Sequence, residues 1–341
     1  MPKRLGNKLG FVAHRHTFEA KEGTVSKSLN LPLARSAVDR DYLQRKNPNL
    51  FDELWANPKT RVLAMHQGKI LLHQNGDKNI PQLKLFEVES IPSATLRVYL
   101  GVSTDDSAFE PAGTPIVLAE LSTSAANQLE SDEGAWISLR RNGAGLSDRD
   151  AGLYAQSLSI ANWHESHTRC SKCGTPTVVI DGGWVRTCVT DEKEFYPRTD
   201  PAIIAAITDD QDRLLMGSQG IWEDNRWSVL AGFVEPGESL AAAVEREIFE
   251  EAGVRVTEID YLGSQSWPFP YSLMVGFKAR ARGEQQLVPD LFEIEKLRWF
   301  SREELAKECS DILLPGRLSI ARALIEDWFG GEIVSASELK G

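Results

Sequence analysis

The stretch from Gly232 to Val254 constrains the fold of this chain more than any other part of its sequence. It opens with glycines and a proline, which predict a tight loop. Residues 239–252 are rich in Ala, Glu and Leu and therefore favour a helix. Ser239 can cap the start of that helix, and Gly253 stands where a helix commonly ends in the left-handed conformation. The sequence thus predicts a loop that leads directly into a helix with defined ends.

Three glutamates fall on one face of this predicted helix. Glu247, Glu250 and Glu251 have the spacing i, i+3, i+4, which places them side by side. Crowded carboxylates repel one another unless positive charge lies among them. A hard divalent cation such as Mg²⁺ or Mn²⁺ prefers carboxylate oxygens and keeps waters for substrate phosphates. A solvated acidic face is the simpler alternative, because most glutamate clusters on helices are of that kind.

The order of residues in this stretch resembles the signature of Nudix hydrolases at every specified position. That order is Gly, five residues, Glu, seven residues, Arg-Glu, an apolar residue, any residue, Glu-Glu, any residue, Gly and an apolar residue. The resemblance implies an enzyme that hydrolyses the pyrophosphate of a nucleoside diphosphate linked to another group.

The charge of the chain bears on its partners. The 341 residues carry a net charge of −11, so no general field attracts nucleic acid or an anionic membrane. An anionic substrate would need metal ions or well-placed arginines and lysines. Four cysteines do not make a disulfide scaffold. No apolar run approaches the ~18 residues of a membrane span, and none follows the basic start as in a secretory signal, so we expect a cytoplasmic protein.

The first half of the chain predicts a domain of short strands without a catalytic constellation. Helices are predicted for Ser36–Lys46 and Leu50–Trp55. The predicted strands are Arg61–Met65, Lys69–His73, Leu83–Val88, Leu96–Val102 and Pro115–Leu121. The hairpin pattern of residues 62–72 has the same form as that of residues 203–216. The first half is therefore expected to be a degenerate relative of the second, without the glutamate helix.

A zinc-ribbon pattern lies between the two halves. Ser147–Asp150 resembles a capping box, and the helix that it would start ends near His167. Cys170 and Cys173 follow in a Cys-x-x-Cys-Gly turn, which points two thiolates at one spot. Cys188 stands where a second half should follow, but Asp191 occupies the place of a fourth cysteine. Asp191, His167 or water would complete a zinc site; a metal-free remnant or a redox-sensitive thiol cluster is the alternative.

The second half predicts the elements of a catalytic α/β domain. Expected strands are Ile203–Ile207, Arg213–Gly217, Trp227–Leu230, Glu258–Gly263, Ser272–Arg280 and Lys296–Phe300. Ser301–Glu304 resembles a capping box, and a last helix is expected over Ser319–Phe329. Between two strands, Ser264–Ser272 carries prolines among aromatic residues, a stiff surface suited to flat rings or simply a rigid strand end.

The Ser264–Ser272 motif resembles the one that marks NADH pyrophosphatases among Nudix enzymes, with Ser266 in place of a proline. The resemblance implies an α/β fold: a Nudix α/β/α sandwich on a mixed sheet, preceded by a zinc ribbon and a degenerate α/β amino-terminal domain. It implies the divisions 1–35 (polar lead-in), 36–166 (amino-terminal domain), 167–199 (zinc ribbon), 200–330 (Nudix domain) and 331–341 (tail). It also implies a homodimer that cleaves NAD(H) with Mg²⁺ or Mn²⁺, holds structural Zn²⁺ and removes NAD caps from RNA 5′ ends.

Carried over by position, the resemblance implies site residues. Ligands of Mg²⁺ or Mn²⁺ would be the carbonyl of Ala231 and the carboxylates of Glu247, Glu250, Glu251 and Glu293. Arg246 would hold Glu238 and the helix carboxylates in place. From the ribbon spacing itself, zinc would bind Cys170, Cys173 and Cys188, with Asp191 as the candidate fourth ligand. Substrate contacts would be Tyr196, Phe233, Gln265, Ser266, Trp267, Pro268, Phe269, Pro270, Tyr271, Ser272, Ala321 and Arg140. A further substrate glutamate of the family is Gly183 here, so that contact is absent.

Two other functions remain open at this point. One is a Nudix hydrolase of ADP-ribose or another nucleoside diphosphate derivative, which the aromatic motif disfavours. The other is a non-enzymatic zinc-ribbon nucleotide sensor, which loss of Nudix glutamates would favour; none is lost. The sequence does not rank NADH, NAD⁺ and NAD-capped RNA as substrates.

Overall fold

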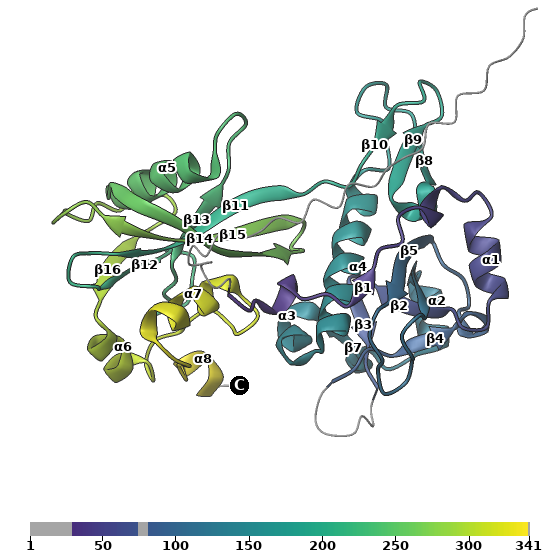
Figure 1. Cartoon of the computed structure of the whole chain (residues 1–341), viewed down its shortest axis with the longest axis horizontal. Coiled ribbons are helices and arrows are strands. Elements are labelled where there is room, and N and C mark those ends of the chain that lie inside the picture. Colours follow the sequence, from purple (N-terminus) through teal and green to yellow (C-terminus); the bar gives the residue numbers. More distant parts are fainter. Residues whose placement is uncertain (1–28, 74–80, 340–341) are drawn as a thin grey trace, which may run out of the picture.

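The structure, a computed structural model, describes residues 29–73 and 81–339 (Figure 1). The amino-terminal and carboxy-terminal domains lie at opposite ends of the molecule, with helix α4 (Asp148–Ser166) and the ribbon hairpin on the amino-terminal side of the junction. Residues 1–28 of the predicted lead-in and the last two residues of the predicted tail lie outside the described residues. Within the described ranges, none of the helices is long and apolar enough to cross a membrane.

The amino-terminal domain is built on one mixed sheet. Its strands are β1 (Val38–Asp39), β2 (Arg61–His66), β3 (Lys69–Leu71), β4 (Leu85–Glu87), β5 (Leu96–Ser103), β6 (Pro115–Glu120) and β7 (Trp136–Ser138). They follow the order β1-β5-β6-β2-β3-β7, with β4 paired to β2, and only β2 and β6 are parallel. The helices are α1 (Leu50–Ala56), α2 (Thr123–Leu129), α3 (Leu139–Asn142) and α4. The five strands predicted for this half are present, as is the helix at α1.

Two predictions for this domain are wrong in part. Ser36–Lys46 is not a helix, because Val38–Asp39 pairs with the edge of β5 and Asp41 has a positive φ of 41°; only Gln44–Lys46 forms a 3₁₀ turn. Ser147 does cap α4, but Asp150 does not complete a capping box. Its buried carboxylate instead accepts hydrogen bonds from the Leu83 N–H (2.9 Å) and Arg149 Nε (2.8 Å).

The ribbon is a small sheet that is held to α4 by hydrogen bonds of His164. It consists of β8 (Thr177–Ile180), β9 (Val185–Cys188) and β10 (Glu194–Phe195) in the order β10-β9-β8. Nε2 of His164 lies 2.8 Å from the Gly183 carbonyl, and Arg186 Nη1 lies 2.9 Å from its Nδ1. A neutral imidazole satisfies both contacts, since one nitrogen donates and the other accepts. Burial lowers the pKa of His164 to about 4, which favours that neutral form.

The carboxy-terminal domain is an α/β/α sandwich, as predicted. Its strands are β11 (Asp200–Thr208), β12 (Leu214–Ser218), β13 (Leu230–Phe233), β14 (Val256–Trp267), β15 (Ser272–Ala281) and β16 (Lys296–Phe300). They follow the order β14-β15-β11-β12-β16, with β13 paired to β11 and β11 parallel to β15. Helix α5 (Leu240–Ala252) packs on one face; α6 (Arg302–Glu308) and α7 (Ile320–Phe329) pack on the other, and α8 (Ala336–Leu339) follows. The capping box at Ser301 is confirmed.

The aromatic motif differs from its predicted form. The sequence places Ser264–Ser272 between strands, but β14 continues to Trp267, so only residues 268–271 form the turn. Because successive strand residues face opposite sides of a sheet, the motif is divided between two surfaces.

Candidate active site

A close contact between strand β13 and helix α5 shapes the glutamate face. Ser239 accepts a hydrogen bond from the Ala242 N–H and caps α5, and Gly253 ends it at φ 69°. A Cβ atom on Gly232 would lie 2.0 Å from the carboxylate carbon of Glu247. Glycine at this position therefore lets the Glu247 carboxylate lie directly against the end of β13.

Arg246 joins the loop to the helix. Its guanidinium donates to both oxygens of Glu238 (2.8 and 2.9 Å), to Glu247 and Glu250 (2.9 Å each) and to the carbonyl of Phe233 (2.9 Å). These partners raise the pKa of Arg246, Glu238 foremost, so the cation is stabilised. The geometry thus gives Arg246 a positioning role for three carboxylates.

Glu251 is the exception among the helix glutamates. Its side chain is 5% exposed, and its Oε2 has no hydrogen-bond partner among the residues that the structure describes. Burial, with repulsion from Glu247 and Glu293, raises the pKa of Glu251 to about 8. Burial also raises the pKa of Glu247. An unpartnered buried carboxylate beside further carboxylates fits a divalent cation, which would supply the missing partner.

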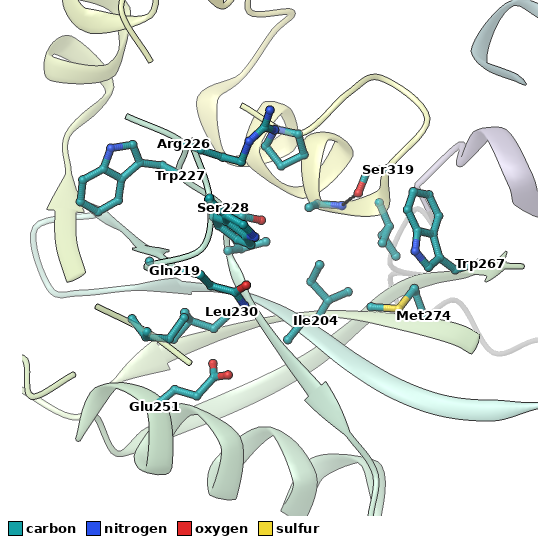
Figure 2. Close-up of a pocket in the computed structure, with 18 of the residues that line it drawn as sticks. Ile204, Gln219, Arg226, Trp227, Ser228, Leu230, Glu251, Trp267, Met274 and Ser319 are labelled. Atoms are coloured by element: carbon teal, nitrogen blue, oxygen red, sulfur yellow. Dashed lines mark hydrogen bonds between the residues drawn. The ribbon is translucent and has the colours of Figure 1, made fainter. Parts of the chain in front are cut away.

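A pocket of about 520 Å³ opens beside Glu251 (Figure 2). In Figure 2, Trp267 stands at one end, Arg226 and Trp227 lie toward the other, and Glu251 enters from the α5 side. Strand β11 pairs with β12 only at Thr208 and diverges to pair with β13, which leaves room above the sheet. Of the predicted site residues, the pocket brings together Ala231, Glu251, Trp267, Ala321 and Arg140.

Other predicted residues lie outside this pocket. Tyr196 and Phe233 are 64% and 60% exposed, and Gln265 is buried, donating from Nε2 to the Leu318 carbonyl at 3.1 Å. Glu250 and Glu293 are exposed and do not line the pocket. A second cavity of about 280 Å³ is lined by Ser266, Tyr271 and Ser272. A groove toward the amino-terminal domain is lined by Pro268, Phe269 and Pro270.

Sequence reasoning missed one wall of the pocket, which Gln219, Trp222, Arg226 and Trp227 form. Arg226 is paired with Glu223 at 2.6 Å. The only sequence feature that could have revealed this wall is the pair of tryptophans around an arginine before β13. That feature is equally typical of core, and the Trp227 ring does pack edge-on against Phe300.

The predicted zinc ligands meet in space. Ligand atoms of Cys170, Cys173, Cys188 and Asp191 all lie within 4.8 Å of one another. Backbone N–H groups of Lys172 and Thr190 point at the sulfurs of Cys170 and Cys188, at 3.4 Å each, which stabilises thiolates. Three sulfurs and one carboxylate oxygen are a donor set that zinc accepts.

The structure distinguishes the candidates for the fourth zinc ligand. Asp191 Oδ1 accepts from the Lys193 N–H, and Oδ2 lies 3.6 Å from Lys172 Nζ. His167 is instead tilted against the ring of Trp163 and bonded to Ser166, and it is not part of the cluster. Asp191 is therefore the side chain placed to complete the site.

Three family models match the chain along most of its length. Residues 59–163 match the NADH pyrophosphatase-like rudimentary NUDIX domain, residues 165–196 the NADH pyrophosphatase zinc ribbon domain, and residues 198–317 the NUDIX domain. The match to a rudimentary NUDIX domain confirms the prediction that the first half of the chain is a degenerate relative of the second. The match to a zinc ribbon supports the prediction that the chain binds Zn²⁺.

Curated relatives carry related names. The "NAD-capped RNA hydrolase NudC" of Mycobacterium tuberculosis (strain ATCC 25618 / H37Rv) is 39% identical over 203 residues, covering 56% of this chain and 64% of that protein. The "NAD-capped RNA hydrolase NUDT12" of Homo sapiens is 37% identical over 198 residues, covering 54% of this chain and 42% of that protein. A crystal structure of a NUDIX hydrolase from Nitrosomonas europaea aligns at 23% identity with a TM-score of 0.39, covering 49% of this chain and 95% of that one.

The fold, the glutamate helix and the family match define a Nudix domain over residues 198–317. Residues 59–196 match, in this order, the rudimentary NUDIX and zinc ribbon domains described for NADH pyrophosphatases.

Proposed function

We propose that this protein hydrolyses the pyrophosphate of NAD(H) to AMP and nicotinamide mononucleotide, and that it also removes NAD caps from RNA 5′ ends. The observation that carries the proposal is Glu251, a buried carboxylate without a hydrogen-bond partner that faces a pocket with an aromatic end. The names of the curated relatives agree with this substrate class.

Mg²⁺ or Mn²⁺, when bound, would neutralise pyrophosphate oxygens and lower the pKa of an attacking water. The carboxylates of Glu247, Glu250, Glu251 and Glu293 and the Ala231 carbonyl would hold the ion. Arg246 keeps Glu247 and Glu250 oriented, so less reorganisation is needed during the reaction.

The pocket walls would bind the two ends of the dinucleotide. Trp267 offers a ring face for stacking with a base, an interaction of ~1–3 kcal/mol. Arg140 brings positive charge to the pocket of an otherwise acidic chain, whereas the charge of Arg226 is balanced by its pair with Glu223. This local charge compensates for the missing long-range attraction of an anionic substrate.

Product analysis with NADH, NAD⁺, NAD-capped RNA and ADP-ribose tests the proposal. We expect AMP and reduced nicotinamide mononucleotide from NADH, with a higher kcat/KM than for ADP-ribose. Equal efficiency on ADP-ribose would favour the broader class of nucleoside diphosphate substrates. Binding without turnover of any of the four would favour a nucleotide sensor.

Two further expectations remain predictions. The first is a homodimer, which light scattering would test against the 37.9 kDa mass of one chain. The second is a cytoplasmic location, which fractionation of cells would test.

A further inference from the structure

The turn that carries the aromatic motif has few backbone hydrogen-bond donors of its own. Pro268 and Pro270 have no backbone N–H, and within the turn only the Phe269 N–H is bonded locally, to the Trp267 carbonyl at 2.7 Å. No backbone N–H of the turn donates to the carbonyls of Pro268 or Pro270.

Asn162 of helix α4 supplies a donor to both of these carbonyls. Its Nδ2 lies 3.1 Å from the Pro268 carbonyl and 2.7 Å from the Pro270 carbonyl, so one amide group holds both sides of the turn. A weaker contact lies next to it, where the hydroxyls of Ser159 and Ser266 are 3.3 Å apart. Helix α4 thus fixes the backbone on either side of Phe269.

The aromatic side chains of the turn connect this contact to the pocket. Trp267 lines the pocket, both Trp267 and Phe269 pack on the core of the amino-terminal domain, and the two rings meet edge-on with centroids 4.9 Å apart. The Arg140 guanidinium lies 4.1 Å from the Phe269 centroid and 5.5 Å from that of Trp267. A shift of the turn would therefore move the Trp267 ring within the pocket.

We propose that Asn162 is a positioning residue for substrate binding, and that holding the Trp267 turn is one function of the rudimentary domain. The proposal rests on the proposed function in taking Trp267 as a substrate contact. It extends that function by assigning part of the substrate affinity to a residue of the non-catalytic domain. A merely structural contact between domains would affect stability without acting through Trp267.

A double-mutant cycle between Asn162→Ala and Trp267→Ala tests this coupling. Loss of the two hydrogen bonds should raise KM for NADH roughly five- to tenfold while kcat stays within about twofold. Once Trp267 is alanine, Asn162→Ala should add little. Asn162→Asp should be worse than Asn162→Ala, because its carboxylate faces two carbonyl oxygens. Glu165→Gln, an exposed change on the same helix, should leave KM unchanged.

The dissociation constant of NADH, measured on the same variants without divalent metal, keeps the test independent of turnover. Absence of NADH hydrolysis by the wild type would overturn the proposed function, yet the same coupling in binding would still support Asn162. Additive effects of Asn162→Ala and Trp267→Ala, or equal NADH affinity of Asn162→Ala and wild type, would overturn the positioning role. A fall in melting temperature with unchanged NADH affinity would also overturn it.

Discussion

The rudimentary and Nudix domains share one strand layout, yet only one of them has a site. The order β5-β6-β2-β3-β7 corresponds to β14-β15-β11-β12-β16, and β4 pairs with β2 as β13 pairs with β11. In both, a single parallel pair, β2 with β6 and β11 with β15, lies within an otherwise antiparallel sheet. The layout of the sheet is therefore not what makes a catalytic domain.

The two domains differ in the segments that connect equivalent strands. Between β13 and β14 the Nudix domain has helix α5 with its glutamates, whereas between β4 and β5 the rudimentary domain has only a 3₁₀ turn, Val88–Ser90. On the other face, α4 fills its side of the sheet with large buried residues such as Tyr154 and Trp163. At the start of α7, Ser319 and Ala321 are small, and the pocket lies there instead.

Two buried carboxylates show the same contrast at the level of single groups. Asp150 and Glu251 are 0% and 5% exposed, and burial raises the pKa of both. Asp150 is bonded to Arg149 and to the Leu83 N–H, but Glu251 Oε2 has no such partner among the described residues. Both carboxylates are buried, so burial does not distinguish them. The difference is that Asp150 has hydrogen-bond partners within the protein, whereas Glu251 Oε2 has none among the described residues and can bind a ligand.

The zinc ribbon joins the two domains, so loss of its zinc should lower the stability of the protein more than any other change considered below. Structural zinc contributes on the order of 10 kcal/mol in small zinc domains. Cys173→Ser should reduce zinc from close to one ion per chain and lower the melting temperature. Elemental analysis and thermal melts check this. Purified wild type without zinc, prepared without chelators, would contradict the site.

Removal of the Asp150 carboxylate should destabilise the rudimentary domain without affecting chemistry. Asp150→Ala leaves part of Arg149 unpaired in the core and should cost about 3 kcal/mol of unfolding free energy, measured in urea. Asp148→Ala removes an exposed pair with Arg35 and should cost less than about 1 kcal/mol. In folded Asp150→Ala, kcat should stay near the wild-type value; a large loss would erase the contrast with Glu251.

Removal of charge from the glutamate face should have the opposite effect: kcat should fall while stability is kept. Glu247→Gln and Glu251→Gln should not lower the melting temperature but should lower kcat for NADH by roughly 10²–10³. Excess Mn²⁺ should recover part of this loss if the defect is in metal affinity. Glu245→Gln, on the exposed side of α5, serves as the matched control. Wild-type turnover in both mutants would make the face a solvated acidic surface.

The change of stability with pH should be smaller than the effects of the substitutions above. Because burial raises the pKa of Glu251 to about 8, the folded state binds this proton more tightly than the unfolded state, whose pKa is near 4.5. Stability of protein free of Mg²⁺ and Mn²⁺ should therefore fall as pH rises from 5 to 9. Thermal melts of Glu251→Gln should show a smaller fall, and an identical fall would indicate that Glu251 is already compensated.

The sequence predicted local structure where local chemistry dominates. Caps at Ser239, Gly253 and Ser301 and the cysteine turns follow from residue type and spacing, and all are present. The helix predicted for Ser36–Lys46 was wrong because part of this segment pairs with β5, which is distant in sequence, instead of forming a helix. Which aromatic residue enters the pocket depends on how far β14 extends, and the missing partner of Glu251 exists only in three dimensions.

Titration of Mn²⁺ into zinc-loaded protein, followed by calorimetry, tests the central claim most directly. The account predicts that wild type and Glu245→Gln bind Mn²⁺ with similar affinity. Glu251→Gln should bind it at least about tenfold more weakly, since loss of even an outer-shell partner commonly costs that much. Equal Mn²⁺ affinity in wild type and Glu251→Gln would contradict the assignment of the buried carboxylate as the centre of the site.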